Sequence, residues 1–521
     1  MGDTPSADKP LTDRLLRSWT RCRRRAWLDR HGDQGKRIYT AHRTLQLDDQ
    51  QRSFVALLPH KPGHGLAACE RGEAGVVGLR LRGRTEEGQS IEAHPALLQR
   101  QPGRSRWGDY LYRPVLARQG RRLTREHRLQ LALSARLLAG VQQAPVTDGL
   151  ALSGAGRYLE KDKVSLGENL QRQLDEALRR LAIDLERTDP PPLASDRRKC
   201  SLCSWRGVCN AEARRVGHLS EVSGIGAKRR EMLLELGIDG LNALADADPE
   251  RLAEQLQQFG DQHGAVAAPL VAQARAQRNG QAEALTDSAA LPELINAPGV
   301  LLYDIESDPD ARDDFLHGFV CLPRDSDGRW DPQRATYHPL LMLQEQGEAR
   351  CWKRIKRFLK RYEGWPVLHY GETESLALRK MAKRQGVSDV ERHALRCRLV
   401  DVHARVRSHW RLPLNSYGLK TVADWLGFGW SQAGVDGARA LLWWRQWRGT
   451  GPRDRGHDQA LRWIFAYNRD DGLATWTVAA WMLAEDNRSQ ARVGGSQKAL
   501  GRQMETSTPL FPACNVSASS A

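Results

Sequence analysis

The sequence lacks the long apolar runs and the apolar leader that would direct a protein into or across a membrane. No stretch approaches the roughly 20 uninterrupted apolar residues that a membrane-spanning helix needs. The opening MGDTPSADKP contains no apolar signal core. We therefore expect a cytoplasmic protein with no membrane partner.

Cysteine is scarce, and acidic side chains are outnumbered by basic ones. The 521 residues include nine cysteines, which would stay reduced in the cytoplasm, so a cysteine cluster would indicate metal or redox chemistry rather than disulfides. Asp and Glu number 63 against 79 Lys and Arg, which gives a formal net charge of +16. This surplus favours polyanionic partners, and we expect DNA or RNA; a solubilising basic surface is the alternative. The sequence identifies no protein partner.

The chain is too long for one ordinary hydrophobic core, so several domains are expected. Residues 1–215 alternate strand-like and helix-like stretches, whereas residues 216–285 show helical periodicity alone. Residues 286–299 have the composition of a linker, and a second α/β domain is predicted over residues 300–485. Residues 486–521 are polar and rich in Ser and Gly, so we expect a disordered tail.

Two acids follow the apolar run VLLY in the second α/β domain. Because side chains alternate along a strand, Asp304 and Glu306 at i and i+2 project to the same side. Two carboxylates about 4 Å apart repel by roughly 4 kcal/mol at an effective dielectric near 20, and a divalent cation relieves that repulsion. We therefore expect Mg²⁺ or Mn²⁺ here; two solvated acids at the start of an acidic loop are the alternative.

A second acidic motif lies near the end of the same domain. The stretch RWIFAYNRDDGLATW has helical periodicity and places Tyr467 and Asp471 at i and i+4 on one face. The carboxylate can complete a metal shell while the phenol orients an attacking water, as two-metal phosphodiester hydrolysis requires. An ordinary helix with solvated acids is the alternative.

The order DIE, HYGETE, LVD, SYGLK and YNRDD resembles the RNase H-like (DEDD, DnaQ-like) exonucleases with a YxxxD third motif. This resemblance implies an RNase H-like α/β fold, a site for two Mg²⁺ or Mn²⁺ ions, and catalytic roles for Asp304, Glu306, Tyr467 and Asp471. The family's second motif usually ends in aspartate, but this chain offers Glu374, which we favour as catalytic residue and metal ligand over Asp401. We assign no catalytic role to the nearby His369.

Lys420, in SYGLKTVADWLGF, lies in a segment that also resembles these exonucleases. By the resemblance it would contact a phosphate of the nucleic acid. A solvated helix lysine is the alternative.

Three of the cysteines form the compact pattern C-x2-C-x5-C at Cys200, Cys203 and Cys209. Thiolates at this spacing suit zinc or an iron-sulfur cluster, and Cys22 is the best candidate for a fourth ligand. One early and three late cysteines resemble the iron-sulfur RecB-like and AddB-like nucleases. The resemblance implies a restriction-endonuclease-like PD-(D/E)XK domain with a [4Fe-4S] cluster; Zn²⁺, or an unrelated Cys22, is the alternative.

The active site of that nuclease family is degenerate in this chain. Ala96 stands where the family has an aspartate, and Leu-Ala-Arg at residues 116–118 stands where it has E-x-K. We therefore expect the fold and the cluster without hydrolytic activity, unless Glu92 and Asp109 supply the missing acids.

The segment LSEVSGIGAKRREMLLELGI predicts a glycine-flanked turn between two amphipathic helices. Glycines allow close backbone approach, and amides at the start of the second helix can face a phosphate. The segment resembles a helix-hairpin-helix, which implies that Gly224, Gly226 and Lys228 contact a nucleic-acid backbone without reading sequence. A turn that serves only protein packing is the alternative.

The whole order resembles bacterial RecB-like nucleases with a C-terminal exonuclease-like domain. It implies a metal-dependent 3′–5′ exonuclease that hydrolyses DNA or RNA in its RNase H-like domain. A non-catalytic iron-sulfur scaffold that binds nucleic acid, or an endonuclease with an unrecognised N-terminal site, is the alternative.

Overall fold

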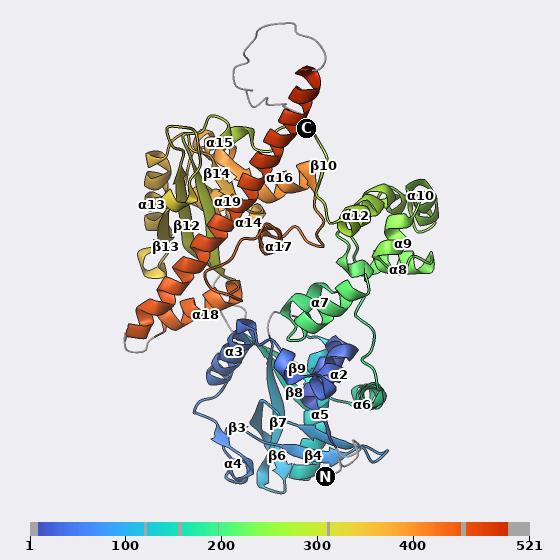
Figure 1. Cartoon of the computed structure of the whole chain (residues 1–521). Coiled ribbons are helices and arrows are strands. Elements are labelled where there is room, and N and C mark those ends of the chain that lie inside the picture. The colour runs from blue at the N-terminus through green and yellow to red at the C-terminus, as the bar shows by residue number, and fades with distance from the viewer. Residues whose placement is uncertain are drawn as a thin grey trace, which may run out of the picture.

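The computed structural model describes residues 9–118, 122–154, 159–195, 197–309, 313–449 and 455–498. Figure 1 shows three parts in chain order: an N-terminal α/β domain in blue, a small helical module in green, and a second α/β domain in yellow to red. The chain is therefore a mixed α/β multidomain protein, as the sequence predicts.

The N-terminal domain is built on a six-stranded mixed sheet in the order β2-β3-β6-β7-β8-β9. Strands β6 and β7 are antiparallel, whereas β8 is parallel to β7, so the chain crosses between them through helix α5 (Arg125–Gln142). The strands are β2 (Gly63–His64), β3 (Gly75–Val77), β6 (Leu97–Ser105), β7 (Gly108–Arg118), β8 (Asp148–Ser153) and β9 (Glu160–Ser165). A smaller sheet contains β1 (Leu11–Thr12), β5 (Ser90–Ala93) and β4 (Leu81–Arg84).

Helices α1 (Asp13–Arg21), α5 and α6 (Glu168–Glu186) supply most of the apolar core of this domain. Their leucines, for example Leu16, Leu133 and Leu178, are buried in one cluster. The indole of Trp19 donates to the buried Asp184 carboxylate at 2.7 Å, which joins α1 to α6. Helix α2 (Arg23–His31) follows α1 directly.

The helical module contains η4 (Leu219–Glu221), α8 (Ala227–Glu235), α9 (Leu241–Asp246), α10 (Pro249–Gln257), α11 (Asp261–Gly264) and α12 (Ala267–Asn279). The prediction of an amphipathic α-helix before the SGIG turn is wrong. Gly217, at φ +59°, follows the end of α7 (Arg206–Arg215), and the short segment before the turn forms a single 3₁₀ turn. The turn itself leads into α8 as expected.

Residues 286–299 are not the linker that their composition predicts. Strand β10 (Glu283–Ala284) pairs with β16 (Trp410–Arg411), and the side chains of Leu291 and Leu294 are buried in the core of the second α/β domain. The prediction from composition fails because burying the Leu291 and Leu294 side chains is more favourable than leaving them in water.

The second α/β domain has a five-stranded sheet in the order β13-β12-β11-β14-β15. The strands are β11 (Gly299–Asp308), β12 (Asp313–Pro323), β13 (Thr336–Leu341), β14 (Val367–His369) and β15 (Leu399–Asp401). Strand β12 is antiparallel to both β11 and β13, whereas β14 is parallel to both β11 and β15. The carboxyl ends of three strands, including the central β11, therefore lie along one edge.

Helices cover both faces of this sheet (Figure 1). On one face lie α13 (Glu348–Arg361), α14 (Glu372–Arg384) and α15 (Asp389–Arg398). On the other face lie α16 (Val402–His409), α17 (Leu419–Trp425) and α19 (Arg455–Lys498). The sheet is thus the middle layer of three.

Helix α19 continues to Lys498, so the prediction that disorder begins at residue 486 is wrong. Asp486 in this helix accepts a hydrogen bond from the backbone N–H of Ala290 at 2.8 Å, which fastens the helix beyond the predicted boundary. The rest of the predicted tail, residues 499–521, lies outside the described residues. None of the described helices is both long and apolar enough to cross a membrane.

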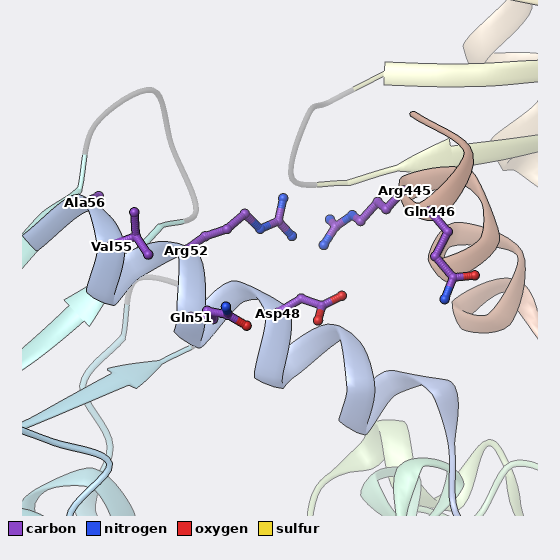
Figure 2. Close-up of a pocket in the computed structure, with 7 residues that line it drawn as sticks. All are labelled: Asp48, Gln51, Arg52, Val55, Ala56, Arg445 and Gln446. Carbon is purple, nitrogen blue, oxygen red and sulfur yellow. The ribbon is translucent and has the colours of Figure 1, made fainter. Parts of the chain in front are cut away.

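The two α/β domains meet where α3 (Ala41–Leu57) packs against α18 (Gly437–Arg448). Arg445 of α18 contacts both Asp49 of α3 at 3.0 Å and Asp308, at the end of β11, at 2.9 Å. Phe315 stacks on Trp444 with ring centroids 4.4 Å apart. Figure 2 shows the pocket between the two helices, lined by Asp48, Gln51, Arg52, Val55, Ala56, Arg445 and Gln446.

We predict that Trp444→Ala lowers the free energy of unfolding by about 3–5 kcal/mol, because it leaves a cavity against Phe315 and α3. Chemical denaturation followed by circular dichroism measures the change. The matched control is Trp463→Ala, since Trp463 is 41% exposed and should lose much less. Equal losses in the two variants would contradict the proposed importance of this contact.

Candidate active site

Strand β11 carries the first two acids of the site. Leu301 and Tyr303 are buried on the α13 side of the sheet, so the alternation turns Asp304 and Glu306 to the α19 side. Asp304 pairs in register with Gly318 of β12, and the ladder shifts just after Glu306. The predicted strand placement of both acids is confirmed.

Helix α19 lies close to this strand because glycines face it. A Cβ at Gly472 would lie 3.0 Å from Val320 Cγ2, and one at Gly318 would lie 1.6 Å from Asn468 Oδ1. Any larger side chain at Gly318 would collide with the helix. The close approach brings Asp471 of α19 over the acids of β11.

Asp304, Glu306 and Asp471 each offer a carboxylate oxygen, and these oxygens all lie within 4.8 Å of one another. Burial is the largest cause that raises the pKa of each carboxyl, and the charge of Asp471 further raises the pKa of Asp304 and Glu306. Hydrogen bonding and the charge of Lys420 oppose the shift at Asp471. The three acids are thus packed more tightly than like charges favour, an arrangement that a divalent cation with oxygen ligands stabilises.

Two neutral donors hold these carboxylates. The Asn468 amide donates to Asp304 Oδ2 at 2.6 Å and accepts from the Tyr337 hydroxyl at 2.9 Å. The Trp430 indole donates to Asp471 Oδ1 at 2.7 Å. None of Asn468, Tyr337 and Trp430 is predicted from the sequence; the amide side chain one position after Tyr467 is the only local signal.

Asp470 and Asp471 have different roles although they are adjacent. Asp470 accepts a hydrogen bond from the Ser431 backbone N–H at 2.8 Å and so fixes the loop that carries Trp430. Asp471 faces the acids of β11. The helix therefore uses one carboxylate to anchor the loop and the next to build the site.

Tyr467 and Lys420 lie beside Asp471. Tyr467 is buried, and burial followed by the charge of Asp471 raises the pKa of its phenol far above the usual range, so the hydroxyl keeps its proton and can donate. The exposed Lys420 places Nζ 4.8 Å from the Tyr467 ring centroid and donates to the backbone oxygen of Val435. Both residues predicted for this site are therefore brought to it.

Glu374 lies in the first turn of α14, near the same carboxylates. Its side chain is buried, and its Oε2 has no hydrogen-bond partner. Burial raises the pKa of Glu374 to about 7. Its charge contributes to the raised pKa values of Asp304 and Glu306, although it is not in the group of oxygens within 4.8 Å. A buried acid oxygen without a partner is a suitable ligand for a cation.

Asp401, the alternative to Glu374, is occupied by backbone groups. Its Oδ1 accepts from the N–H of Gly371 at 3.0 Å and from that of Ala404 at 3.1 Å, so it caps α16 and fastens the start of α14. His369 is buried, and its Nδ1 lies 2.7 Å from the Gly371 carbonyl oxygen. Both side chains shape the turn that presents Glu374.

A comparison with known protein families matches the part of the chain that contains this site. A family model described as the RNase H superfamily matches residues 301–483, from β11 into α19. The C-terminal domain is an RNase H-like domain. The matched residues include the three clustered acids, so the fold and the acidic site are together consistent with nuclease-like activity and divalent metal binding. No curated protein matches the chain.

The four predicted cysteine ligands come from both ends of the N-terminal domain. Cys22 lies between α1 and α2, Cys200 and Cys203 lie in and after η3 (Arg198–Leu202), and Cys209 lies in α7. Burial is the main cause that raises the pKa of the Cys200 and Cys209 thiols, and the charges of Cys203 and Cys22 add to it. The four are therefore neighbours, but among the described residues they do not form a group with all sulfurs within 4.8 Å.

Trp205 fixes this cysteine segment. Its side chain is fully buried, and its indole donates to Asp29 of α2 at 2.8 Å. A Cβ at Gly32 would lie 2.8 Å from the Trp205 ring, so the two ends of the domain are tightly packed. The remaining described cysteines stand apart: Cys69, Cys321 and Cys351 are buried, and Cys397 is exposed.

The N-terminal positions that resemble a degenerate nuclease site do not bring three acids together in the described residues. Arg118 is buried and pairs with Asp162, Glu92 is held by Arg80 and Arg82, and Asp109 is exposed. In the described part of residues 1–215, no three potential ligands lie within 4.8 Å of one another.

The predicted backbone-binding residues of the helical module face solvent. Gly224, at φ +91°, forms the turn, and Gly226 precedes α8. Both glycines and Lys228 are exposed. Their contact with nucleic acid stays a prediction.

We predict that Glu374→Gln stabilises the cation-free protein above pH 7 and not near pH 4.5. The folded pKa of about 7 exceeds the ordinary 4.5, so stability is fully present below pH 4.5 and is lost as pH rises through 7. The neutral variant avoids that loss, which amounts to about 3 kcal/mol at most. Thermal unfolding across this pH range measures it.

The control is Glu372→Gln, two residues earlier in the same helix turn, because Glu372 is exposed and should leave the pH profile unchanged. Mn²⁺ should stabilise the wild type more than Glu374→Gln if Glu374 is a ligand. Identical pH profiles and identical responses to Mn²⁺ in all three proteins would contradict the assignment.

Proposed function

We propose that the protein is a metal-dependent 3′–5′ exonuclease that hydrolyses phosphodiester bonds of DNA or RNA in its RNase H-like domain. The observation that carries the proposal is the meeting of Asp304, Glu306 and Asp471, with all three ligand oxygens within 4.8 Å, inside residues 301–483. In the described part of the chain Asp304 has no ion pair, and its carboxylate accepts a hydrogen bond from the neutral Asn468 amide, so a bound cation would be its partner of opposite charge.

The side chains fit a site for Mg²⁺ or Mn²⁺. Asp304, Glu306 and Asp471 would hold the cations, and Glu374 would complete the set with its unpartnered Oε2. When bound, such ions lower the pKa of an attacking water and neutralise charge on the phosphate. Asn468 and Trp430 orient the Asp304 and Asp471 carboxylates through the hydrogen bonds described above.

Tyr467 and Lys420 would act on the substrate side of the site. The Tyr467 hydroxyl stays protonated and donates to the Asp471 carboxylate in the structure. With Asp471 bound to a cation, the same hydroxyl would donate to a water or a phosphate oxygen and hold the nucleophile in line. Lys420 is exposed and lies over the Tyr467 ring, where its ammonium can attract a phosphate.

We also propose that the remainder of the chain grips the polymer. The resemblance to RecB-like nucleases assigns residues 1–215 a degenerate PD-(D/E)XK fold, and the exposed Gly224, Gly226 and Lys228 would contact the backbone as a helix-hairpin-helix does. The N-terminal endonuclease alternative is less well supported, because no acidic group assembles in the described part of that domain.

Cys22, Cys200, Cys203 and Cys209 would hold a [4Fe-4S] cluster, with Zn²⁺ as the alternative. Arg197 hydrogen-bonds Cys200 and Arg24 hydrogen-bonds Cys209, and both guanidinium charges favour the thiolate forms that metals bind. The cluster would hold together the two ends of the domain that Trp205 already joins.

The test is Mn²⁺-dependent degradation of 5′-labelled single-stranded and recessed DNA and RNA by the wild type and by Asp304→Ala. We expect laddered products from the wild type, and a rate lower by on the order of a thousandfold or more in the variant, because the cation loses a carboxylate. The control is Asp424→Ala, since Asp424 is exposed on α17 outside the cluster and should keep the activity.

Binding of all substrates by both proteins without cleavage would contradict the exonuclease proposal and favour a non-catalytic nucleic-acid-binding scaffold. Cleavage that persists in Asp304→Ala would place the activity elsewhere in the chain.

The cluster is tested by the colour and metal content of anaerobically purified protein. We expect visible absorption and iron in the wild type, and loss of both in Cys22→Ser, because the fourth ligand is gone. Cys397→Ser is the control, since Cys397 is exposed and far along the chain from this group. Zinc without iron would select the alternative, and neither metal would contradict the site.

A further inference from the structure

One surface of the RNase H-like domain has a charge that the carboxylate site does not explain. Residues 348–398, which contain α13, α14 and α15, carry fourteen Lys and Arg against six Asp and Glu. This segment of about a tenth of the chain has half of the formal net charge of +16. The three helices lie together on the face of the sheet opposite α19 (Figure 1).

Helix α13 orders its charges into one stripe. The basic stripe consists of Arg350, Lys353, Arg354, Arg357, Lys360 and Arg361. Their spacing of i, i+3, i+4, i+7, i+10 and i+11 places all six on one side of the helix. The buried residues Cys351, Trp352, Ile355 and Leu359 occupy the other side. The stripe is about 16 Å long at 1.5 Å per residue.

All six side chains of the basic stripe are exposed. Within the described part of the chain none of the six forms an ion pair; Arg354 reaches only the Leu341 carbonyl oxygen, and Arg361 lies over the Tyr362 ring. Like charges three and four residues apart repel one another on a helix, so the stripe weakens the helix that carries it. Lys360 and Arg361 in the last turn favour the helix dipole. The other four charges have no ion pair in the described part of the chain to offset their repulsion, which favours a function for them.

The basic surface continues beyond α13. Lys356 pairs with Glu391 of α15, and Arg384 of α14 pairs with Glu348, so the acids nearest the stripe are already engaged. Arg379, Lys380 and Lys383 are exposed on α14, the helix whose first turn presents Glu374 to the carboxylate site. The charges therefore extend from the stripe along a helix that begins at the site.

We propose that the basic stripe of α13, together with the exposed charges of α14, binds the phosphate backbone of the nucleic acid at a distance from the carboxylates. The inference rests on the proposed nuclease function and adds a second place where the polymer is held. Flexible, unpaired Lys and Arg side chains on an open helix face suit sequence-independent phosphate contacts. The surface would anchor a long strand while its end lies at Asp304, Glu306 and Asp471.

The test measures binding of a long, labelled single-stranded DNA or RNA oligonucleotide to the full chain in EDTA, where cleavage cannot contribute. The variant is Lys353→Gln/Arg357→Gln/Lys360→Gln, which removes three stripe charges and keeps good helix formers. We expect Kd to rise by about tenfold or more, and the slope of log K against log salt to fall by about 2, for three lost phosphate contacts.

The control removes three exposed arginines of the same domain outside the stripe and α14, Arg329→Gln/Arg334→Gln/Arg407→Gln, with the same change in net charge. It should bind within about twofold of the wild type, because these charges lie in the β12–β13 connection and on α16 rather than on the proposed contact surface. Thermal unfolding confirms that all proteins are folded. Equal affinity and equal salt slope in the stripe variant and the wild type, or equal weakening in the control, would overturn the proposal.

Because the assay contains no divalent cation, its result does not depend on hydrolysis. A stripe variant that binds like the wild type while Asp304→Ala abolishes cleavage would reject the surface and keep the active site. A stripe variant that binds weakly while no protein cleaves would keep the surface and reject the active site.

Discussion

The structure of the site depends on how closely α19 can approach β11. Gly318 and Gly472 add no side chain of their own to the contact between the helix and the sheet, and a Cβ at Gly318 would collide with the Asn468 amide. Asn468 then reaches Asp304. Asp471, three residues later on the same side of the helix, comes close to Glu306. Residues more than 160 positions apart in the chain thus meet in one group. The distance between the α19 backbone and the sheet decides whether these acids can share a cation.

This packing places several carboxyl groups where water stabilises them poorly. Burial raises the pKa of Asp304, Glu306, Asp471 and Glu374, and their mutual repulsion adds to the first two. Without a cation, ionisation of these carboxyl groups as pH rises lowers the free energy of unfolding. With a cation bound, the ionised carboxylates would be its ligands. Stability lost in the cation-free state is therefore linked to affinity for the ion, and Trp430 and Asn468 limit the loss by hydrogen bonding.

Much of the site was predictable because it follows from local periodicity. Strand alternation places Asp304 with Glu306, and helical spacing places Tyr467 with Asp471. Trp430 was not predictable, because its position depends on a loop that Asp470 anchors through Ser431. The linker and tail predictions failed because composition does not reveal tertiary contacts: Leu291 and Leu294 find a core, and Asp486 finds the backbone of Ala290. The arrangement of the four predicted cysteine ligands was not predictable either, because Cys22 and the other three come from opposite ends of the domain and meet only through its tertiary packing.

The central claim is that Asp304, Glu306 and Asp471 form one divalent cation site. Titration of Mn²⁺ into the metal-free protein, followed by electron paramagnetic resonance, tests it directly by counting bound ions and giving their affinities. We predict tight binding that strengthens as pH rises, because protons compete for the same carboxylates, and that is lost in Asp471→Asn. Equal stoichiometry and affinity in the wild type and in Asp471→Asn would contradict the account.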